Sequence, residues 1–105
     1  MTNVNTVTST ENFQEIAATG TVVVDFWAAW CGPCRAYAPA FAEAAKNTPE
    51  AAFVKVNVDD LPEIAAAYGV QSIPTTVILR DGEPVGRLIG AVPARTLEEA
   101  VQQAG

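Results

Sequence analysis

The sequence predicts an α/β fold, in which a mixed sheet, parallel in its first part, carries helices on both faces. Strand-like runs alternate with segments whose apolar residues recur at helical spacing through residues 4–69. The run TVVVDFW, residues 21–27, is apolar on both faces, which is typical of a strand covered on both sides. A hairpin pattern at residues 75–90 adds antiparallel strands. The predicted order is therefore β-α-β-α-β-α-β-β-α.

The first helix is expected after a short strand at residues 4–7. Thr8-x-x-Glu11 matches a capping box, and Gly20 is a natural stop for the helix. After the two cysteines, a second helix is predicted from apolar residues at helical spacing: Tyr37, Phe41, Ala44 and Ala45. Pro39 interrupts this helix and should kink it.

The second half of the chain begins with a strand at residues 51–58. Pro62 can open a short helix that stops at Gly69. A last helix at residues 93–104 places its apolar residues on one face: Leu97, Ala100, Val101 and Ala104.

Two features of the hairpin at residues 75–90 predict its turn and the position of its second strand in the sheet. Asp81-Gly82 is a favoured two-residue turn. Pro84 cannot donate a ladder hydrogen bond, so the second strand of the hairpin should be an edge strand.

Composition narrows the possible functions. At 105 residues, half of them hydrophobic, we expect one domain, residues 1–105, and a monomer. The net charge of −6 argues against nucleic acid as a partner. No apolar run approaches a membrane span, and the N-terminus lacks a signal-peptide pattern, so a cytoplasmic protein is expected. Histidine is absent, which removes the commonest general base and metal ligand.

The only two cysteines stand in W-C-G-P-C-R, residues 30–35, and permit three interpretations. A zinc site needs four ligands, of which two thiols without histidine supply half. A structural disulfide closing so short a loop would constrain the unfolded chain little. A redox-active pair explains more of the surrounding residues, because a strand ends near Trp27 and a helix begins just after Cys31.

That placement predicts the chemistry of the pair. Pro33 suits the first turn of a helix, so Cys31 should face unpaired N–H groups and the positive end of the helix dipole, which lower the pKa of a thiol. Cys34 falls on the same helical face. An exposed Cys31 thiolate can then attack a disulfide of another protein, and Cys34 can resolve the mixed disulfide. The Gly32-Pro33 spacer adds no positive charge beside the thiolate, which favours a reductant.

The motif W-C-G-P-C with a following basic residue and a preceding V-D-F-W-A resembles the thioredoxin family. The similarity continues through V-K-V-N, Y-G-V, S-I-P-T and G-A along nearly the whole chain. It implies a thioredoxin fold, with a five-stranded mixed sheet flanked by four helices. It also implies a protein-disulfide reductase that binds no cofactor. Electrons come from NADPH through a thioredoxin reductase and pass to oxidised clients such as ribonucleotide reductase or peroxiredoxins, which maintains cell redox homeostasis.

Two charged residues lie in otherwise apolar strands. Asp25 is either a carboxylate satisfied by hydrogen bonds or a counter-ion, or a buried acid behind Cys34 whose raised pKa lets it accept the Cys34 proton. The resemblance implies the second role. Lys55 either extends its amine to solvent or tunes the proton affinity of Asp25.

The resemblance also implies a docking surface for clients. Pro74 is expected to be a cis proline beside the two sulfurs, where it prevents metal capture and exposes backbone groups to an extended client peptide. The apolar residues around it could be core, but the resemblance assigns them to the client-binding rim: Trp30, Gly32, Pro33, Val58, Ile73, Gly90 and Ala91. Trp27 is interpreted as structural.

The chain departs from the family pattern at three neighbouring positions. Arg35 replaces a more usual lysine, and Ala36 and Tyr37 stand where larger aliphatic residues are common. An alternative function stays open at this point, in which the domain is a binding or chaperone-like subunit with idle thiols. A disulfide oxidase or isomerase is disfavoured by the Gly-Pro spacer.

Overall fold

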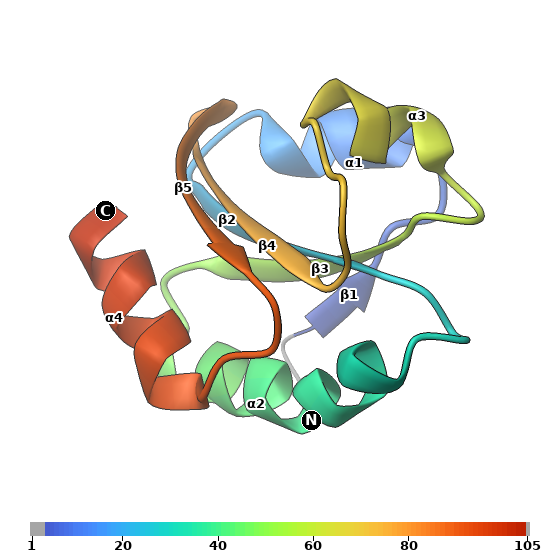
Figure 1. Ribbon diagram of the computed structural model, residues 1–105. Helices are drawn as coiled ribbons and strands as arrows, with labels where there is room; N and C mark the ends of the chain where they lie inside the picture. Colours follow the sequence, from blue (N-terminus) through green and yellow to red (C-terminus); the bar gives the residue numbers. More distant parts are fainter. Residues whose placement is uncertain (1–3, 105) are drawn as a thin grey trace.

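The computed structural model describes residues 4–104 and contains five strands and four helices in that range (Figure 1). In chain order they are β1 (Val4–Thr6), α1 (Thr10–Ala17), β2 (Thr21–Trp27), α2 (Gly32–Asn47), β3 (Ala52–Asn57), α3 (Pro62–Ala67), β4 (Thr75–Arg80), β5 (Glu83–Ile89) and α4 (Ala94–Ala104). The predicted element order is confirmed.

The five strands form one mixed sheet in the order β1-β3-β2-β4-β5. β1 and β2 both run parallel to β3, whereas β4 pairs antiparallel with both β2 and β5. The central strand β2 is buried on both faces, as its apolar run predicted. β5 is an edge strand, which is where Pro84 was expected.

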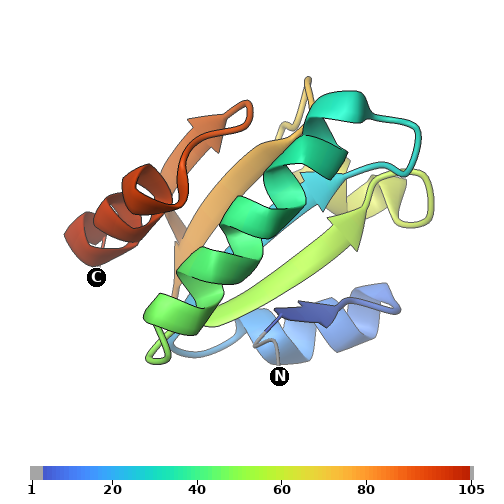
Figure 2. The same ribbon diagram turned by 90° about the horizontal axis from the view of Figure 1, so that it is seen from below.

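Helices cover both faces of the sheet (Figures 1 and 2). On one face, α1 and α3 pack with Val22, Val24 and Phe26 in one apolar cluster. On the other face, α2 and α4 pack with Val23, Phe53 and Ile78 in a second cluster. Because side chains alternate along a strand, β2 contributes to both clusters with successive residues.

The start of α1 corrects one sequence prediction. The N-cap is Ser9, whose hydroxyl accepts a hydrogen bond from the Asn12 N–H at 3.0 Å, and the Asn12 side-chain oxygen accepts one from the Thr8 N–H at 3.1 Å. The capping box predicted from Thr8 and Glu11 is therefore wrong by one residue. Ser9 caps the helix as Thr8 was expected to, but the Asn12 side chain bonds the N–H of Thr8, the residue before the cap, so the arrangement is only similar to a capping box.

The hairpin turn follows its sequence signal. Asp81 and Gly82 have φ values of 50° and 87°, the left-handed conformation that a tight two-residue turn requires at both positions. The turn also holds the loop between α1 and β2, because the Gly20 N–H donates to an Asp81 carboxylate oxygen at 2.8 Å.

The helix α2 positions the cysteines. Its N-cap is Cys31, Pro33 lies in its first turn, and it continues through Pro39 to Asn47. Figure 2 shows α2 lying along the sheet from the β2–α2 loop to the opposite end of the strands. Within residues 4–104, no helix is both long enough and apolar enough to cross a membrane.

Candidate active site

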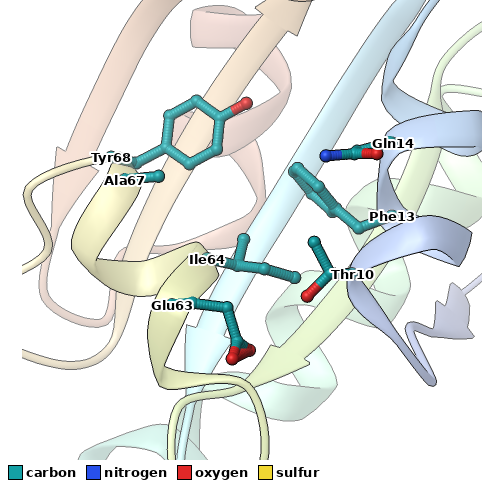
Figure 3. Close-up of a pocket in the computed structure, with 7 residues that line it drawn as sticks. All are labelled: Thr10, Phe13, Gln14, Glu63, Ile64, Ala67 and Tyr68. Carbon is teal, nitrogen blue, oxygen red and sulfur yellow. The ribbon is translucent and has the colours of Figure 1, made fainter.

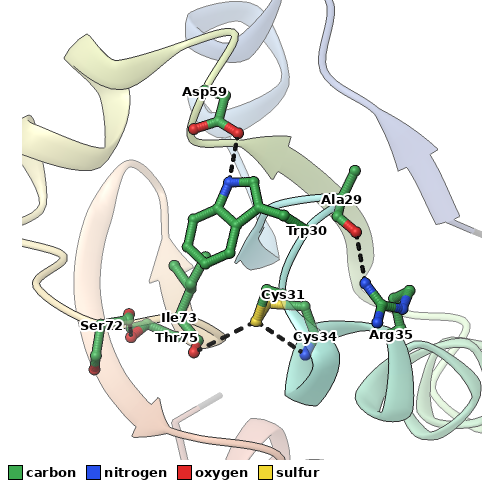
Figure 4. The surroundings of a disulfide bond; sticks show 9 residues. All are labelled: Ala29, Trp30, Cys31, Cys34, Arg35, Asp59, Ser72, Ile73 and Thr75. Carbon is green, nitrogen blue, oxygen red and sulfur yellow. Dashed lines mark hydrogen bonds between the residues drawn. A yellow bond between two sulfur atoms is a disulfide. The ribbon is translucent and has the colours of Figure 1, made fainter.

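The two cysteines form a disulfide at the N-terminus of α2 (Figure 4). Cys31 is the N-cap, and its Sγ accepts a hydrogen bond from the Cys34 N–H at 3.2 Å. The Cα atoms of the two residues are 5.2 Å apart, so one helical turn brings both sulfurs together. The predicted location of Cys31 at a helix start is confirmed. This amide would also stabilise a thiolate on Cys31 in the reduced protein.

The expectation of an exposed Cys31 is wrong for this disulfide state. Cys31 is 5% exposed and Cys34 is 2% exposed. Both belong to a small apolar cluster with Ala28, against which Val58 and Ile73 pack. Apolar side chains thus pack against the disulfide and cover most of its surface.

The loop before β4 closes one side of the disulfide. The Ile73–Pro74 peptide bond is cis, which confirms that Pro74 is a cis proline. The Ile73 carbonyl oxygen lies 3.8 Å from Cys31 Sγ (Figure 4). The Pro74 carbonyl accepts a hydrogen bond from the Gly90 N–H at 2.8 Å, so residues from the two ends of the hairpin meet beside the sulfurs.

Trp30, which directly precedes Cys31, is not a core residue. Its side chain is 68% exposed, and its indole N–H donates to an Asp59 carboxylate oxygen at 2.8 Å (Figure 4). Arg35 donates a hydrogen bond to the Ala29 carbonyl at 2.8 Å, which ties the loop before Trp30 to α2. The basic residue after the motif therefore fixes this loop.

A shallow apolar groove of about 210 Å³ lies beside the disulfide. It brings together three residues that the sequence analysis selected, Trp30, Val58 and Ile73. It also has lining residues that sequence reasoning missed: Ala65, Val70, Gln71 and Ser72. Periodicity assigned Ala65 to a helix, and the available signals for Val70 and Ser72 were their places in the Y-G-V and S-I-P-T segments of the family resemblance.

The remaining predicted docking residues lie around the same end of the sheet. Gly32 and Pro33 are exposed in the first turn of α2, and Ala91 is exposed after β5. Gly90 has a φ of +90°, and a Cβ atom added there would meet nothing within 4 Å. Gly90 is thus required for its backbone conformation, and the space above it is open.

A larger cavity lies between α1 and α3, on the face of the sheet opposite α2 (Figure 3). Its volume is about 400 Å³, and its lining residues are Thr10, Phe13, Gln14, Glu63, Ile64, Ala67 and Tyr68. No predicted site residue lines it, whereas Trp30, Val58 and Ile73 line the smaller groove, and Val58 and Ile73 pack against the cysteines.

Asp25 is buried beneath α2. Only 1% of its surface is exposed, and neither carboxylate oxygen has a hydrogen-bond partner. Desolvation raises the pKa of Asp25 to about 7, against a partial lowering by the charge of Lys55. A carboxyl with this pKa can exchange a proton near neutral pH.

Lys55 faces Asp25 and also contacts an aromatic ring. The two residues are register partners on β3 and β2. The Lys55 ammonium lies 4.4 Å from the centroid of the Trp27 ring, a cation–π geometry. Trp27 also packs against the cysteine cluster, in agreement with its structural interpretation.

Sequence reasoning missed a polar pair beside Asp25. The Tyr37 hydroxyl and the Thr76 hydroxyl are hydrogen-bonded at 2.8 Å, and the two residues are 1% and 0% exposed. Thr76 is the register partner of Asp25 on β4. The departure of Tyr37 from the family pattern and a threonine inside an apolar strand were the available signals.

The comparisons with known proteins decide the family. The thioredoxin family profile matches residues 3–103. The chain belongs to the thioredoxin family. Thioredoxin of Mycoplasma genitalium is 48% identical over 91 residues, which cover 86% of this chain and 89% of that protein. Thioredoxin 1 of Synechococcus elongatus is 47% identical over 83 residues, 78% of each chain. The solved thioredoxin of Fasciola hepatica aligns with a TM-score of 0.87 at 36% identity, over 96% of this chain and 99% of that one.

Family membership and the paired cysteines give the activity. The protein is a thiol-disulfide oxidoreductase of the thioredoxin family, and its function is protein-disulfide reduction. The alternative of idle thiols is not favoured, because the sulfurs already form the redox-active disulfide. Thioredoxins need no bound cofactor, and their partners are a thioredoxin reductase and client proteins. Among residues 4–104, no group of three or more potential ligands could hold a metal ion.

Proposed function

We propose that Cys31 is the attacking sulfur and Cys34 the resolving sulfur. The observation that carries this assignment is the position of Cys31 as N-cap of α2, where its sulfur accepts the Cys34 N–H. In the reduced protein, the Cys31 thiolate attacks one sulfur of a client disulfide, and the other client sulfur leaves as a thiolate.

The second step closes the disulfide seen in the structure. Cys34 loses its proton and attacks Cys31 Sγ, which breaks the mixed disulfide and releases the remaining client sulfur as a thiolate. Two electrons have then moved to the client, and both client thiolates take up protons. Because Cys34 is held one helical turn from Cys31, this step is intramolecular.

Asp25 is the acceptor of the Cys34 proton in this proposal, and Lys55 adjusts its affinity. A carboxylate buried without a partner binds a proton readily, and its pKa of about 7 suits transfer from a thiol at neutral pH. The Lys55 charge favours the ionised form, so it keeps a fraction of Asp25 ready to accept a proton.

The client docks on the surface around the disulfide. The groove beside Trp30, Val58 and Ile73 supplies apolar contact, and the exposed Gly32 and Pro33 extend that contact across the start of α2. The loop at Pro74 and the segment Gly90-Ala91 border the sulfurs on the hairpin side, where open space above Gly90 admits a peptide backbone.

The electron path and setting complete the proposal. Electrons come from NADPH through a thioredoxin reductase, and clients of the ribonucleotide reductase and peroxiredoxin classes receive them. The chain works as a single domain and as a monomer, in the cytoplasm. The support is the family, whose relatives include thioredoxins of two Mycoplasma species.

Insulin reduction coupled to NADPH and a thioredoxin reductase tests the two sulfur roles. Cys31→Ser and Cys34→Ser should each lower turnover by about three orders of magnitude or more, because the chain has no other thiol. Only Cys34→Ser should accumulate mixed disulfides with client, detected by mass spectrometry. Trapping by Cys31→Ser instead would reverse the assignment.

A further inference from the structure

The Asp25 carboxylate lies in a row of three side chains that all face α2. Asp25 on β2 pairs directly with Lys55 on β3 and with Thr76 on β4. Directly opposite residues of a sheet project from the same face, with their Cβ atoms about 5 Å apart. That face is the α2 side, because Val23 and Ile78, two residues away on β2 and β4, belong to the α2 cluster.

The side chains of two residues of α2 lie over this row. Cys34 and Tyr37 are three positions apart on the buried face of the helix. The titratable groups that face Asp25 are therefore Lys55 from β3 and Cys34 and Tyr37 from α2. β4 contributes no titratable group there, only the Thr76 hydroxyl, which is bonded to Tyr37.

The Tyr37–Thr76 pair has one hydrogen to spare. Each hydroxyl carries one hydrogen, and their mutual bond uses only one of the two, whichever atom donates. Next to the pair lies a carboxylate whose two oxygens accept nothing. Two buried hydroxyls beside a buried carboxylate have no packing benefit over aliphatic side chains. What hydroxyls supply, and aliphatic side chains do not, is an unused donor and a dipole.

We propose that Tyr37 and Thr76 are positioning residues that stabilise the ionised form of Asp25 through their dipole and their unused hydroxyl hydrogen. This inference rests on the proposed role of Asp25 as acceptor of the Cys34 proton. The Tyr37 hydroxyl is bonded to Thr76, the direct strand neighbour of Asp25, and Tyr37 lies one turn after Cys34 on α2. The pair thus links the helix that carries the resolving sulfur to the strand beside the proton acceptor.

The direct test is the titration of Asp25, followed by the ¹³C signal of its carboxyl group in the oxidised protein. The disulfide keeps both sulfurs from titrating. Thr76→Val should raise the midpoint by about 0.5–1 pH unit, and Tyr37→Phe should raise it less, because Thr76 keeps its hydroxyl. Thr76→Ser, which retains a hydroxyl, should restore a midpoint near that of the wild type.

Matched controls separate this effect from general disturbance. Thr48→Val removes a buried hydroxyl at the far end of α2, and Tyr68→Phe makes the same change on the other face of the sheet. Neither should move the midpoint. Because Thr76→Val strands the Tyr37 hydroxyl, Tyr37→Phe/Thr76→Val is a second variant that leaves no unpaired group. An unchanged or lowered midpoint in both Thr76→Val and the double variant overturns the inference.

The rate at which Cys34 resolves a preformed mixed disulfide distinguishes this inference from the proposed function. The pH of half-maximal rate should rise with the Asp25 midpoint in each variant. If the Tyr37 and Thr76 variants move the Asp25 midpoint but leave the pH profile of the resolution rate unchanged, the inference about the pair stands and Asp25 is not the proton acceptor. If Asp25→Asn resolves mixed disulfides slowly but the Tyr37 and Thr76 variants leave the Asp25 midpoint unchanged, Asp25 is the acceptor and the inference about the pair fails.

Discussion

The layer between the sheet and α2 has two halves with opposite chemistry. Its far half contains the sheet row Phe53–Val23–Ile78, with Phe41 above it. Its near half, toward the disulfide, contains the row Lys55–Asp25–Thr76 with Tyr37. Each near-half residue lies two positions along its strand, or four along α2, from its far-half counterpart. The backbone environment is therefore shared, and only the side chains change.

The two halves differ in what they contribute to the stability of the fold. The far half is close-packed and apolar, and each of its side chains stabilises the fold by burial. The near half buries a carboxylate with no hydrogen-bond partner, an arrangement that opposes folding when the group ionises. The near half lies next to the sulfurs, where the proposed mechanism uses the destabilising group as a proton acceptor.

The largest effect expected from breaking this contrast is that of Asp25→Asn. The pKa of Asp25 rises from 3.8 to about 7 on folding. Between these values the folded protein keeps a proton that the unfolded chain has released, so the free energy of unfolding falls as pH rises. The gap corresponds to about 4 kcal/mol. Asn cannot ionise, so the variant should match wild type near pH 4 and exceed it by several kcal/mol at pH 8.

Urea unfolding of the two oxidised proteins across this range measures the difference. A constant offset between them at every pH would show that Asp25 has an ordinary pKa. The same variant should resolve mixed disulfides more slowly, so one substitution should stabilise the fold and impair the chemistry.

A smaller effect is expected from Lys55→Met, which removes the one positive charge of the near half. The Lys55 charge lowers the pKa of Asp25, so its loss should raise the Asp25 midpoint by about one pH unit. Lys46→Met, an exposed change in the last turn of α2, is the matched control and should leave the midpoint unchanged. If both variants titrate like wild type, Lys55 only extends its amine to solvent over Trp27.

The far half and most of the fold were predictable from the sequence because they follow from periodicity. The two-sided run at β2, the Asp81-Gly82 turn and the edge proline each express a local rule, and each proved correct. The start of α1 was wrong by one residue. Ser9 and Thr8 are both good N-caps, and the choice depended on the partner three residues later.

The near half was only partly predictable. Asp25 and Lys55 stood out because charged residues are rare in buried strands. The Tyr37–Thr76 bond joins residues 39 positions apart, and only the pairing of β2 with β4 brings it to Asp25. The burial of Cys31 was missed for a similar reason, since Ile73 and Val58 come from distant loops.

Ile78→Val gives the smallest effect and sharpens the comparison from the far half. Ile78 lies on the same strand and face as Thr76, two residues away, and is 1% exposed. Loss of one buried methyl group should lower the free energy of unfolding by about 1 kcal/mol. Because no charge is nearby in that row, the loss should be equal at pH 5.5 and pH 8, and the Asp25 titration should not move. A Cβ on Gly86 would lie 3.3 Å from the Ile78 Cδ1 that this variant lacks, so Gly86→Ala should recover part of the loss in the Ile78→Val background. A loss that varied with pH would mean that the two halves are electrostatically coupled, and the contrast between them would fail.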